Sequence, residues 1–240
     1  MAYGLVGVMK DMMIELKNLT INYGSRTALS QINGVFKKGS LTAITGQNGA
    51  GKSTLLKAIA GIIKVNNGTI ITHIKANKIS YLPQASEIER DFPLSVLHMV
   101  TTGYFQRFGG FCAITSAMQK KAIAAIAEVG LGGLENNNIA DLSFGQFQRA
   151  LFARLIIQDA ELILLDEPFA AIDFETTIRL TNIIKKWHNE NRTVICILHD
   201  IEHIRNNFHD CLVINGKCLA WDKAEIALRN YNIRLLDCHG

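Results

Sequence analysis

The sequence predicts an α/β protein in which a mostly parallel sheet is flanked by helices. Three features support this fold class. Short apolar segments alternate with segments of helical character through most of the 240 residues. A glycine-rich loop that begins at residue 46 stands between a short strand and a helix. Residues 162–165 form an unbroken apolar run, which is typical of a strand buried on both faces of a parallel sheet.

The first part of the chain is predicted to be rich in strands. Alternating apolar and polar residues predict a strand at 14–23. A short apolar run predicts a second strand at 40–45, and the glycine-rich loop then leads into a helix at 52–60. Residues 68–81 indicate two short strands around a polar turn.

From about residue 87 the pattern becomes helical, and it returns to α/β alternation near residue 159. Loops of glycine and asparagine separate three predicted helices, and two further strands and two further helices follow before a hairpin-like pair. The helices are expected at 95–101, 116–129, 143–158, 175–190 and 200–207, the strands at 161–166 and 193–198, and the hairpin at 212–221. We therefore predict one domain over residues 1–240, with an α/β core (13–86 and 159–225) and an inserted helical subdomain (87–158).

Composition is that of an ordinary folded protein, with 48% hydrophobic and 19% charged residues. The formal net charge of +4 is not gathered into a basic stripe, so no nucleic-acid partner is expected. No stretch approaches the roughly 18 apolar residues of a membrane-spanning helix. Residues 1–8 lack the basic start and the cleavage site of a signal peptide. We expect any connection with a membrane to come through a partner.

The five cysteines, an odd and scattered set without a CxxC pair, favour reduced thiols in a cytosolic protein. A disulfide framework or a zinc site is not expected. The cysteines are Cys112, Cys196, Cys211, Cys218 and Cys238.

The glycine-rich loop matches the phosphate-binding pattern G-x-x-x-x-G-K-[ST]. Its residues are Gly46, Gln47, Asn48, Gly49, Ala50, Gly51, Lys52 and Ser53, and Thr54 follows. Glycines allow backbone N–H groups to turn inward around phosphates, and the helix N-terminus adds partial positive charge. Lys52 can reach the β- and γ-phosphates, and the Ser53 hydroxyl can bind magnesium. The alternative, a glycine-rich turn that only caps a helix, is disfavoured by the strand before it and the helix after it.

An acidic pair, Asp166 and Glu167, ends the buried strand at 161–166. A carboxylate at the carboxyl end of a buried strand can hold magnesium, and the next residue can polarise an attacking water. Alone, such a pair is commonly a solvated strand end. Together with a phosphate loop upstream, it indicates a nucleotide-hydrolysing site.

Residues 142–146, Leu-Ser-Phe-Gly-Gln, resemble the LSGGQ signature of ABC ATPases. Four further residues stand in the order of that family's motifs: Tyr23 for the aromatic residue that stacks on adenine, Gln84 for the Q-loop glutamine, Asp173 for the D-loop and His199 for the switch histidine. The resemblance covers about residues 13–220. It implies a P-loop NTPase core with an N-terminal antiparallel β portion. Phe144 departs from the family's glycine, and we expect its side chain to point away from the nucleotide.

The resemblance also implies a mechanism in which two copies face each other and enclose ATP and Mg²⁺. One copy would supply Tyr23, the phosphate loop, Gln84, Asp166, Glu167 and His199, with Lys52, Glu167 and His199 as catalytic residues and Ser53, Gln84 and Asp166 around the magnesium. The other copy would supply Ser143, Gly145 and Gln146, with Asp173 also near the nucleotide. The implied partners are integral membrane permease subunits and, indirectly, an extracytoplasmic substrate-binding protein, with this chain peripheral on the cytoplasmic side of the inner membrane.

Residues 91–96 and 103–111 are similar to the matching segments of zinc and manganese importers within the family. The transported substrate would never contact this chain. Only the surface that docks the permease can therefore carry sequence information about the substrate. Transport of another substrate, or export, remains an alternative. A non-transport ABC ATPase is disfavoured because such proteins usually carry two cassettes or a coiled-coil insertion, and a P-loop kinase is disfavoured by the signature. His199 and His203 do not fit the HExxH zinc pattern.

Overall fold

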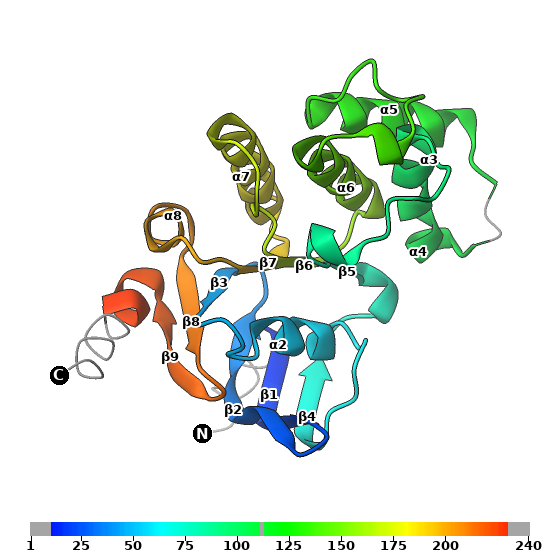
Figure 1. The fold of residues 1–240 in the computed structure, drawn as a ribbon. Helices are drawn as coiled ribbons and strands as arrows, with labels where there is room; N and C mark the ends of the chain where they lie inside the picture. Colours follow the sequence, from blue (N-terminus) through cyan, green and yellow to red (C-terminus); the bar gives the residue numbers. More distant parts are fainter. Residues whose placement is uncertain (1–10, 111–112, 230–240) are drawn as a thin grey trace.

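The computed structural model describes residues 11–110 and 113–229. Its strands form two sheets (Figure 1). The larger sheet has the order β5-β6-β7-β3-β8-β9, and only its β8–β9 pair is antiparallel. The smaller sheet, β2-β1-β4, is antiparallel. The strands are β1 (Met12–Tyr23), β2 (Arg26–Lys37), β3 (Leu41–Thr45), β4 (Asn67–Thr72), β5 (Ile79–Leu82), β6 (Leu162–Asp166), β7 (Thr193–Ile197), β8 (Asp210–Ile214) and β9 (Cys218–Lys223).

Helices lie on both faces of the larger sheet (Figure 1). Helix α2 occupies the space between the two sheets, and α3 to α7 lie on the opposite face of the larger sheet. The helices are α2 (Lys52–Ile59), α3 (Val96–Thr101), α4 (Phe105–Phe108), α5 (Ser116–Glu128), α6 (Phe144–Gln158), α7 (Phe174–Asn189) and α8 (Ile201–Asn207), with short 3₁₀ turns η1 (Ala76–Lys78), η2 (Ala85–Glu87), η3 (Thr102–Tyr104) and η4 (Ile139–Asp141).

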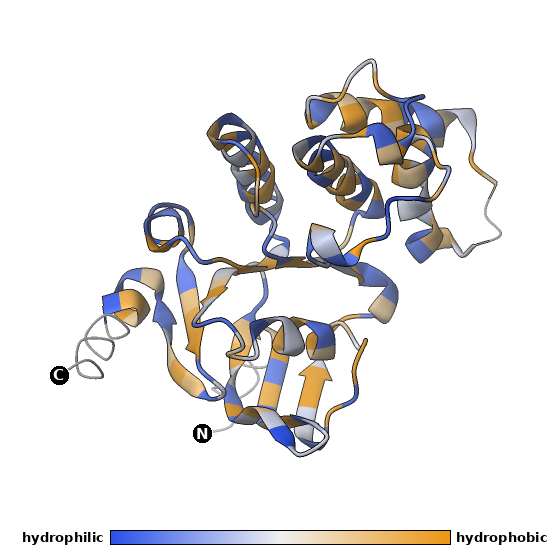
Figure 2. Ribbon diagram, viewed as in Figure 1, coloured by the Kyte–Doolittle hydropathy of each residue, from blue (hydrophilic) through white to orange (hydrophobic). Residues whose placement is uncertain are grey.

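The central strands separate two hydrophobic cores, because side chains alternate between the faces of a strand. Leu162 and Leu164 of β6 pack with α2 and the smaller sheet. Ile163 and Leu165 pack with the helices of the other face. All five residues of β6 are buried, as the apolar run predicts. Hydrophobic residues accordingly follow the strands of both sheets in Figure 2.

The predicted fold class is confirmed: a mostly parallel sheet is flanked by helices and preceded by antiparallel strands. Every predicted strand and helix is present, with ends that differ by one or two residues. The two strands expected within residues 68–81 are present as β4 and β5, but they belong to different sheets. Strand β2 and helix α4 were not predicted. The division into core and helical subdomain stays a prediction.

Some sequence positions lie outside the described residues. They include the segment 1–8 discussed for a signal peptide, and Cys112 and Cys238. None of the helices within residues 11–110 and 113–229 combines the length and the hydrophobicity that a transmembrane span requires.

Candidate nucleotide-binding site

The glycine-rich loop joins the end of β3 to the start of α2. Its glycines are required by geometry at two places. A Cβ on Gly46 (φ 147°) would lie 1.9 Å from the carbonyl oxygen of Ile214, and a Cβ on Gly51 (φ 93°) would lie 2.6 Å from that of Ala28. The loop therefore passes so close to β8 and β2 that a side chain at either position would collide with backbone.

Lys52, the first residue of α2, folds back over this loop. Its Nζ donates hydrogen bonds to the carbonyl oxygens of Gly46 at 3.0 Å and Gln47 at 2.9 Å. Burial lowers the pKa of Lys52, although Glu167 and Asp166 oppose that shift electrostatically. An ammonium held in this position neutralises negative charge that enters the loop.

Asp166 is the last residue of β6 and is completely buried. Its Oδ1 accepts a hydrogen bond from the Ser53 hydroxyl at 3.0 Å, and its Oδ2 accepts one from the Tyr81 hydroxyl at 3.3 Å. Burial raises the pKa of Asp166, while the hydrogen bonds from Ser53, Tyr81 and Gln84 act in the opposite direction. Ser53 and Asp166 thus bring together a hydroxyl and a carboxylate oxygen, the hard ligands that Mg²⁺ prefers, and the Gln84 side chain, which also carries an amide oxygen, lies beside them. The donor set fits a magnesium ion.

Glu167 and His199 meet at the carboxyl ends of two neighbouring parallel strands, β6 and β7. Glu167 Oε1 lies 2.7 Å from His199 Nε2. The backbone of Glu167 has a φ of 50°, in the left-handed region that non-glycine residues adopt rarely. Such a conformation is typical of functional sites, where the surrounding structure maintains it.

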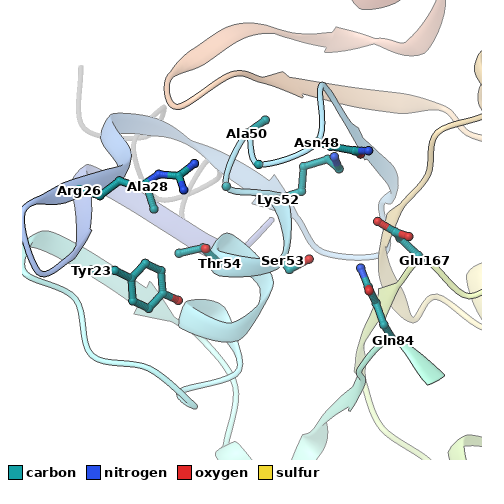
Figure 3. Close-up of a pocket in the computed structure, with 12 residues that line it drawn as sticks. Tyr23, Arg26, Ala28, Asn48, Ala50, Lys52, Ser53, Thr54, Gln84 and Glu167 are labelled. Atoms are coloured by element: carbon teal, nitrogen blue, oxygen red, sulfur yellow. The ribbon is translucent and has the colours of Figure 1, made fainter. Parts of the chain in front are cut away.

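A cavity of about 690 Å³ is lined by part of the glycine-rich loop, the start of α2, Tyr23, Gln84 and Glu167 (Figure 3). Tyr23 lies at one side of this cavity, and Gln84 and Glu167 lie at the other, with the loop and the start of α2 between them. The Tyr23 side chain is exposed, as a platform for a planar ring requires. The predicted residues in its lining are Tyr23, Asn48, Gly49, Ala50, Gly51, Lys52, Ser53, Thr54, Gln84 and Glu167.

Two lining residues, Arg26 and Ala28, were not predicted to take part in the site. Both come from β2, the strand that the sequence pattern did not reveal. The only sequence feature that could have indicated a role for Arg26 is its position three residues after Tyr23. Tyr81 was also missed as a partner of Asp166.

Eight predicted residues do not line this cavity: Gly46, Gln47, Asp166, His199, Ser143, Gly145, Gln146 and Asp173. The last four lie at the N-termini of α6 and α7. Ser143 caps α6 in a capping box: its hydroxyl accepts from the Gln146 N–H at 3.2 Å, and Gln146 Oε1 accepts from the Ser143 N–H at 2.8 Å. Gly145 is in the first turn of the same helix. Asp173 caps α7, where its carboxylate accepts from the Thr176 N–H and hydroxyl, both at 2.8 Å. The hydrogen bonds from Thr176 lower the pKa of Asp173.

Phe144, the departure within the signature, is half-buried and packs against the helical core. Its side chain contributes to packing there, while Ser143 remains exposed.

A phosphate loop between β3 and α2, with an acidic pair at the end of β6 in the same parallel sheet, defines a P-loop nucleotide-hydrolysing protein. The sequence profile of the ABC transporter family matches residues 29–170, and the chain belongs to that family. It is an ABC-type ATPase: members of the family bind ATP and hydrolyse it. Cassettes of this family act as dimers together with membrane permease subunits.

Three relatives illustrate this membership. A "probable ABC transporter ATP-binding protein" of Cyanophora paradoxa is 36% identical over 214 residues, covering 87% of this chain and 88% of its own. A "probable metal transport system ATP-binding protein" of Chlamydia pneumoniae is 35% identical and covers 84% of this chain and 80% of its own. The manganese transport system ATP-binding protein MntB of Listeria monocytogenes is 34% identical and covers 62% of each chain.

Solved structures agree with this assignment. The dimeric structure of MJ0796, a bacterial ABC transporter cassette, is similar with a TM-score of 0.78 and 26% identity. The similarity covers 88% of this chain and 99% of that one.

Proposed function

We propose that this chain energises the import of a metal ion, zinc or manganese, through separate membrane subunits. One observation carries the proposal for its mechanism: the cavity gathers the phosphate loop, Gln84 and Glu167, while Ser143, Gly145 and Gln146 lie outside it. A site open on one side needs a second surface to enclose a terminal phosphate. A second copy of the chain would provide that surface.

Binding of ATP would use both ends of the cavity. The adenine would stack on the exposed ring of Tyr23. The phosphates would lie over the N–H groups of residues 46–54 at the N-terminus of α2, where the helix dipole favours negative charge. Lys52 would add a full positive charge to this cradle.

Ser53 and Asp166, with Gln84 beside them, would hold Mg²⁺. A bound magnesium ion would neutralise charge on the β- and γ-phosphates. The direct hydrogen bond between Ser53 and Asp166, 3.0 Å long, brings the two oxygens close enough to share one ligand.

Hydrolysis would depend on Glu167 and His199. Glu167 lines the cavity and would orient the attacking water or accept its proton. His199, 2.7 Å from that carboxylate, would hold it in place and complete the shell around the γ-phosphate. Their contact supports a shared task at the phosphate end of the cavity.

The second copy would contribute the N-terminus of its helix α6. In that arrangement Ser143, Gly145 and Gln146 of one copy would contact the γ-phosphate held by the other, and Asp173 would approach it through the same interface. ATP would join the two copies, and its hydrolysis would remove the contacts that hold them together.

The metal cargo is supported by the relatives named for metal and manganese transport. In the proposal, the cargo passes through integral permease subunits after delivery by an extracytoplasmic substrate-binding protein, and this chain stays on the cytoplasmic face of the inner membrane. Nucleic acid has no part in it.

The catalytic part is tested with Glu167→Gln. We expect this variant to bind ATP, lose turnover by at least about a hundredfold, and form a stable dimer with ATP, measured by light scattering. Glu161→Gln, at the residue directly before β6, is the matched control and should behave as the parent chain. Parental turnover by Glu167→Gln would remove Glu167 from its role.

The transport part needs a separate experiment. The chain is purified from membranes, and the integral protein that accompanies it is identified. We expect a permease. A strain without this chain should grow poorly when the transported metal, zinc or manganese, is scarce, and it should recover when that metal is supplied in excess. Growth that is indifferent to both metals would refute the metal assignment.

A further inference from the structure

The segment that follows Gln84 is anchored to the phosphate-loop helix. Gln84 lines the nucleotide cavity. Three residues later, Glu87 of η2 accepts a hydrogen bond from Lys57 of α2 at 2.9 Å. One partly exposed ion pair therefore connects the residues just after Gln84 to α2.

Arg90 anchors the far end of the same segment to helix α6. One Nη donates a hydrogen bond to the carbonyl oxygen of Leu142, and the guanidinium lies 4.9 Å from the ring centroid of Phe147, which is fully buried. Charge-assisted hydrogen bonds and cation–π contacts are among the stronger side-chain interactions. The Nε atom is also buried, with no hydrogen-bond partner in the part of the chain that the structure describes. Arg90 is thus held by α6 and largely withdrawn from water.

The hydrogen bond from Arg90 acts on the peptide unit that presents Ser143. The carbonyl oxygen of Leu142 and the N–H of Ser143 belong to one planar peptide. Arg90 holds the oxygen, and Gln146 Oε1 accepts from the N–H at 2.8 Å. Both poles of this peptide are fixed, so its orientation, and with it the direction of the Ser143 side chain, depends on Arg90.

We propose that Arg90 is a positioning residue that links Gln84, which faces the nucleotide of its own copy, to Ser143, which the same copy presents to the nucleotide of its partner. This inference rests on the two-copy site proposed above. Arg90 does not line the nucleotide cavity. Its loss should therefore leave ATP binding by a single copy intact and weaken the closure of two copies around ATP.

The test uses Arg90→Met, which keeps an apolar stem of similar reach and removes the guanidinium. It is made in the full chain that also carries Glu167→Gln, so that ATP-driven dimerisation can be measured without hydrolysis. Arg107→Met is the matched control, because Arg107 also lies over a phenylalanine, Phe108 at 5.3 Å, and pairs with a carboxylate, Asp159 at 3.0 Å, without contacting α6 near Ser143.

Two readouts separate positioning from a general structural effect. Sedimentation should show that Arg90→Met raises the protein concentration needed for ATP-driven dimerisation by about tenfold or more. Binding of a fluorescent ATP analogue to the monomer should be unchanged. Arg90→Lys, which retains a donor and a positive charge, should recover part of the loss, and Arg107→Met should match its parent.

The outcomes are distinguishable. If the Glu167→Gln chain does not dimerise with ATP, the two-copy site itself fails. If that chain dimerises and Arg90→Met dimerises equally well, only the role of Arg90 fails. A parallel loss of ATP binding and dimerisation in both Arg90 variants would also overturn the proposal, because it would indicate a damaged nucleotide site.

Discussion

Replacing Gly46 by alanine perturbs the phosphate loop at its tightest contact. The added Cβ would lie 1.9 Å from the carbonyl oxygen of Ile214, and φ at this position is 147°. The backbone of β8 is paired with β3 on one side and β9 on the other, so it cannot move away from the loop without disturbing those pairs. Gly61, just after α2, has a φ of 74° but open space around its Cβ, so Gly61→Ala isolates the backbone strain from the collision.

The two substitutions should differ in free energy of unfolding. Backbone strain at Gly61→Ala is expected to cost about 1–2 kcal/mol. Gly46→Ala adds overpacking against backbone, which costs roughly 1–3 kcal/mol more. For a chain of this size, each kcal/mol shifts Tm by about 2–4 °C. We expect Gly46→Ala to unfold roughly 6 °C below Gly61→Ala.

Thermal unfolding with and without ATP measures both the loss of stability and the loss of ATP binding. ATP should raise the Tm of the parent chain and of Gly61→Ala, because a ligand stabilises the state that binds it, by about 2.7 kcal/mol at a hundredfold excess over Kd. Gly46→Ala should gain little from ATP. Equal Tm values for the two variants, or an undiminished ATP effect in Gly46→Ala, would show that the close contact between Gly46 and Ile214 does not constrain the loop.

Three further predictions concern other parts of the molecule. Phe144→Gly should lower the free energy of unfolding by about 1–3 kcal/mol, since a half-buried ring is lost from the helical core, while ATP turnover persists; a denaturant titration and a rate assay check both, and unchanged stability would contradict the packing. Tyr81→Phe removes a hydrogen bond to Asp166 and should raise the Mg²⁺ concentration for half-maximal turnover roughly three- to tenfold; an unaltered magnesium dependence would show that the hydroxyl is dispensable. Burial lowers the pKa of His203 below its ordinary value of 6.5, with Asp200 and Lys185 exerting smaller, opposed effects. The unfolded chain therefore takes up this proton first as the pH falls, so the stability contributed by neutral His203 is complete above about pH 6.5 and declines below it. When Tm is measured from pH 8 to pH 5, the Tm of His203→Asn should fall less than that of the parent chain. An equal fall in Tm would exclude His203 as a source of the pH dependence.

The sequence pattern located helices well because their first turns carry chemical markers. Ser95, Ser143 and Asp200 were predicted to begin helices, and each accepts a hydrogen bond from the backbone N–H three residues later. They are N-caps, so the regular helix begins one residue after each of them. Asp173 is likewise an N-cap, but the helix that it begins, α7, was predicted to start at residue 175 and starts one residue earlier.

Strand β2 was not predicted because its buried residues do not alternate with exposed ones. Leu29, Ile32 and Phe36 are buried, at spacings of three and four that resemble a helix more than a strand. Irregular register with β1 and a φ of 52° at Gln31 produce this spacing. Missing β2 also meant missing Arg26 in the cavity lining.

Contacts between distant segments were not visible in the sequence. Nothing near residue 46 indicates Ile214, and nothing near residue 90 indicates Leu142. The phosphate loop and the acidic pair could be recognised because their chemistry depends on short spacings. The contacts that hold them in place depend on tertiary packing, which short sequence spacings do not reveal.

In the proposed arrangement, the γ-phosphate is enclosed between the loop of one copy and the α6 N-terminus of another. The most direct test of this enclosure mixes two chains, each with its five native cysteines replaced by alanine: one carries Asn48→Cys with Glu167→Gln, and the other carries Gly145→Cys with Glu167→Gln. A short bifunctional thiol reagent should join the two chains to each other when ATP is present and leave them apart without it. Cross-linking that does not depend on ATP, or no cross-linking while both chains bind ATP, would show that the γ-phosphate is not enclosed between these two surfaces.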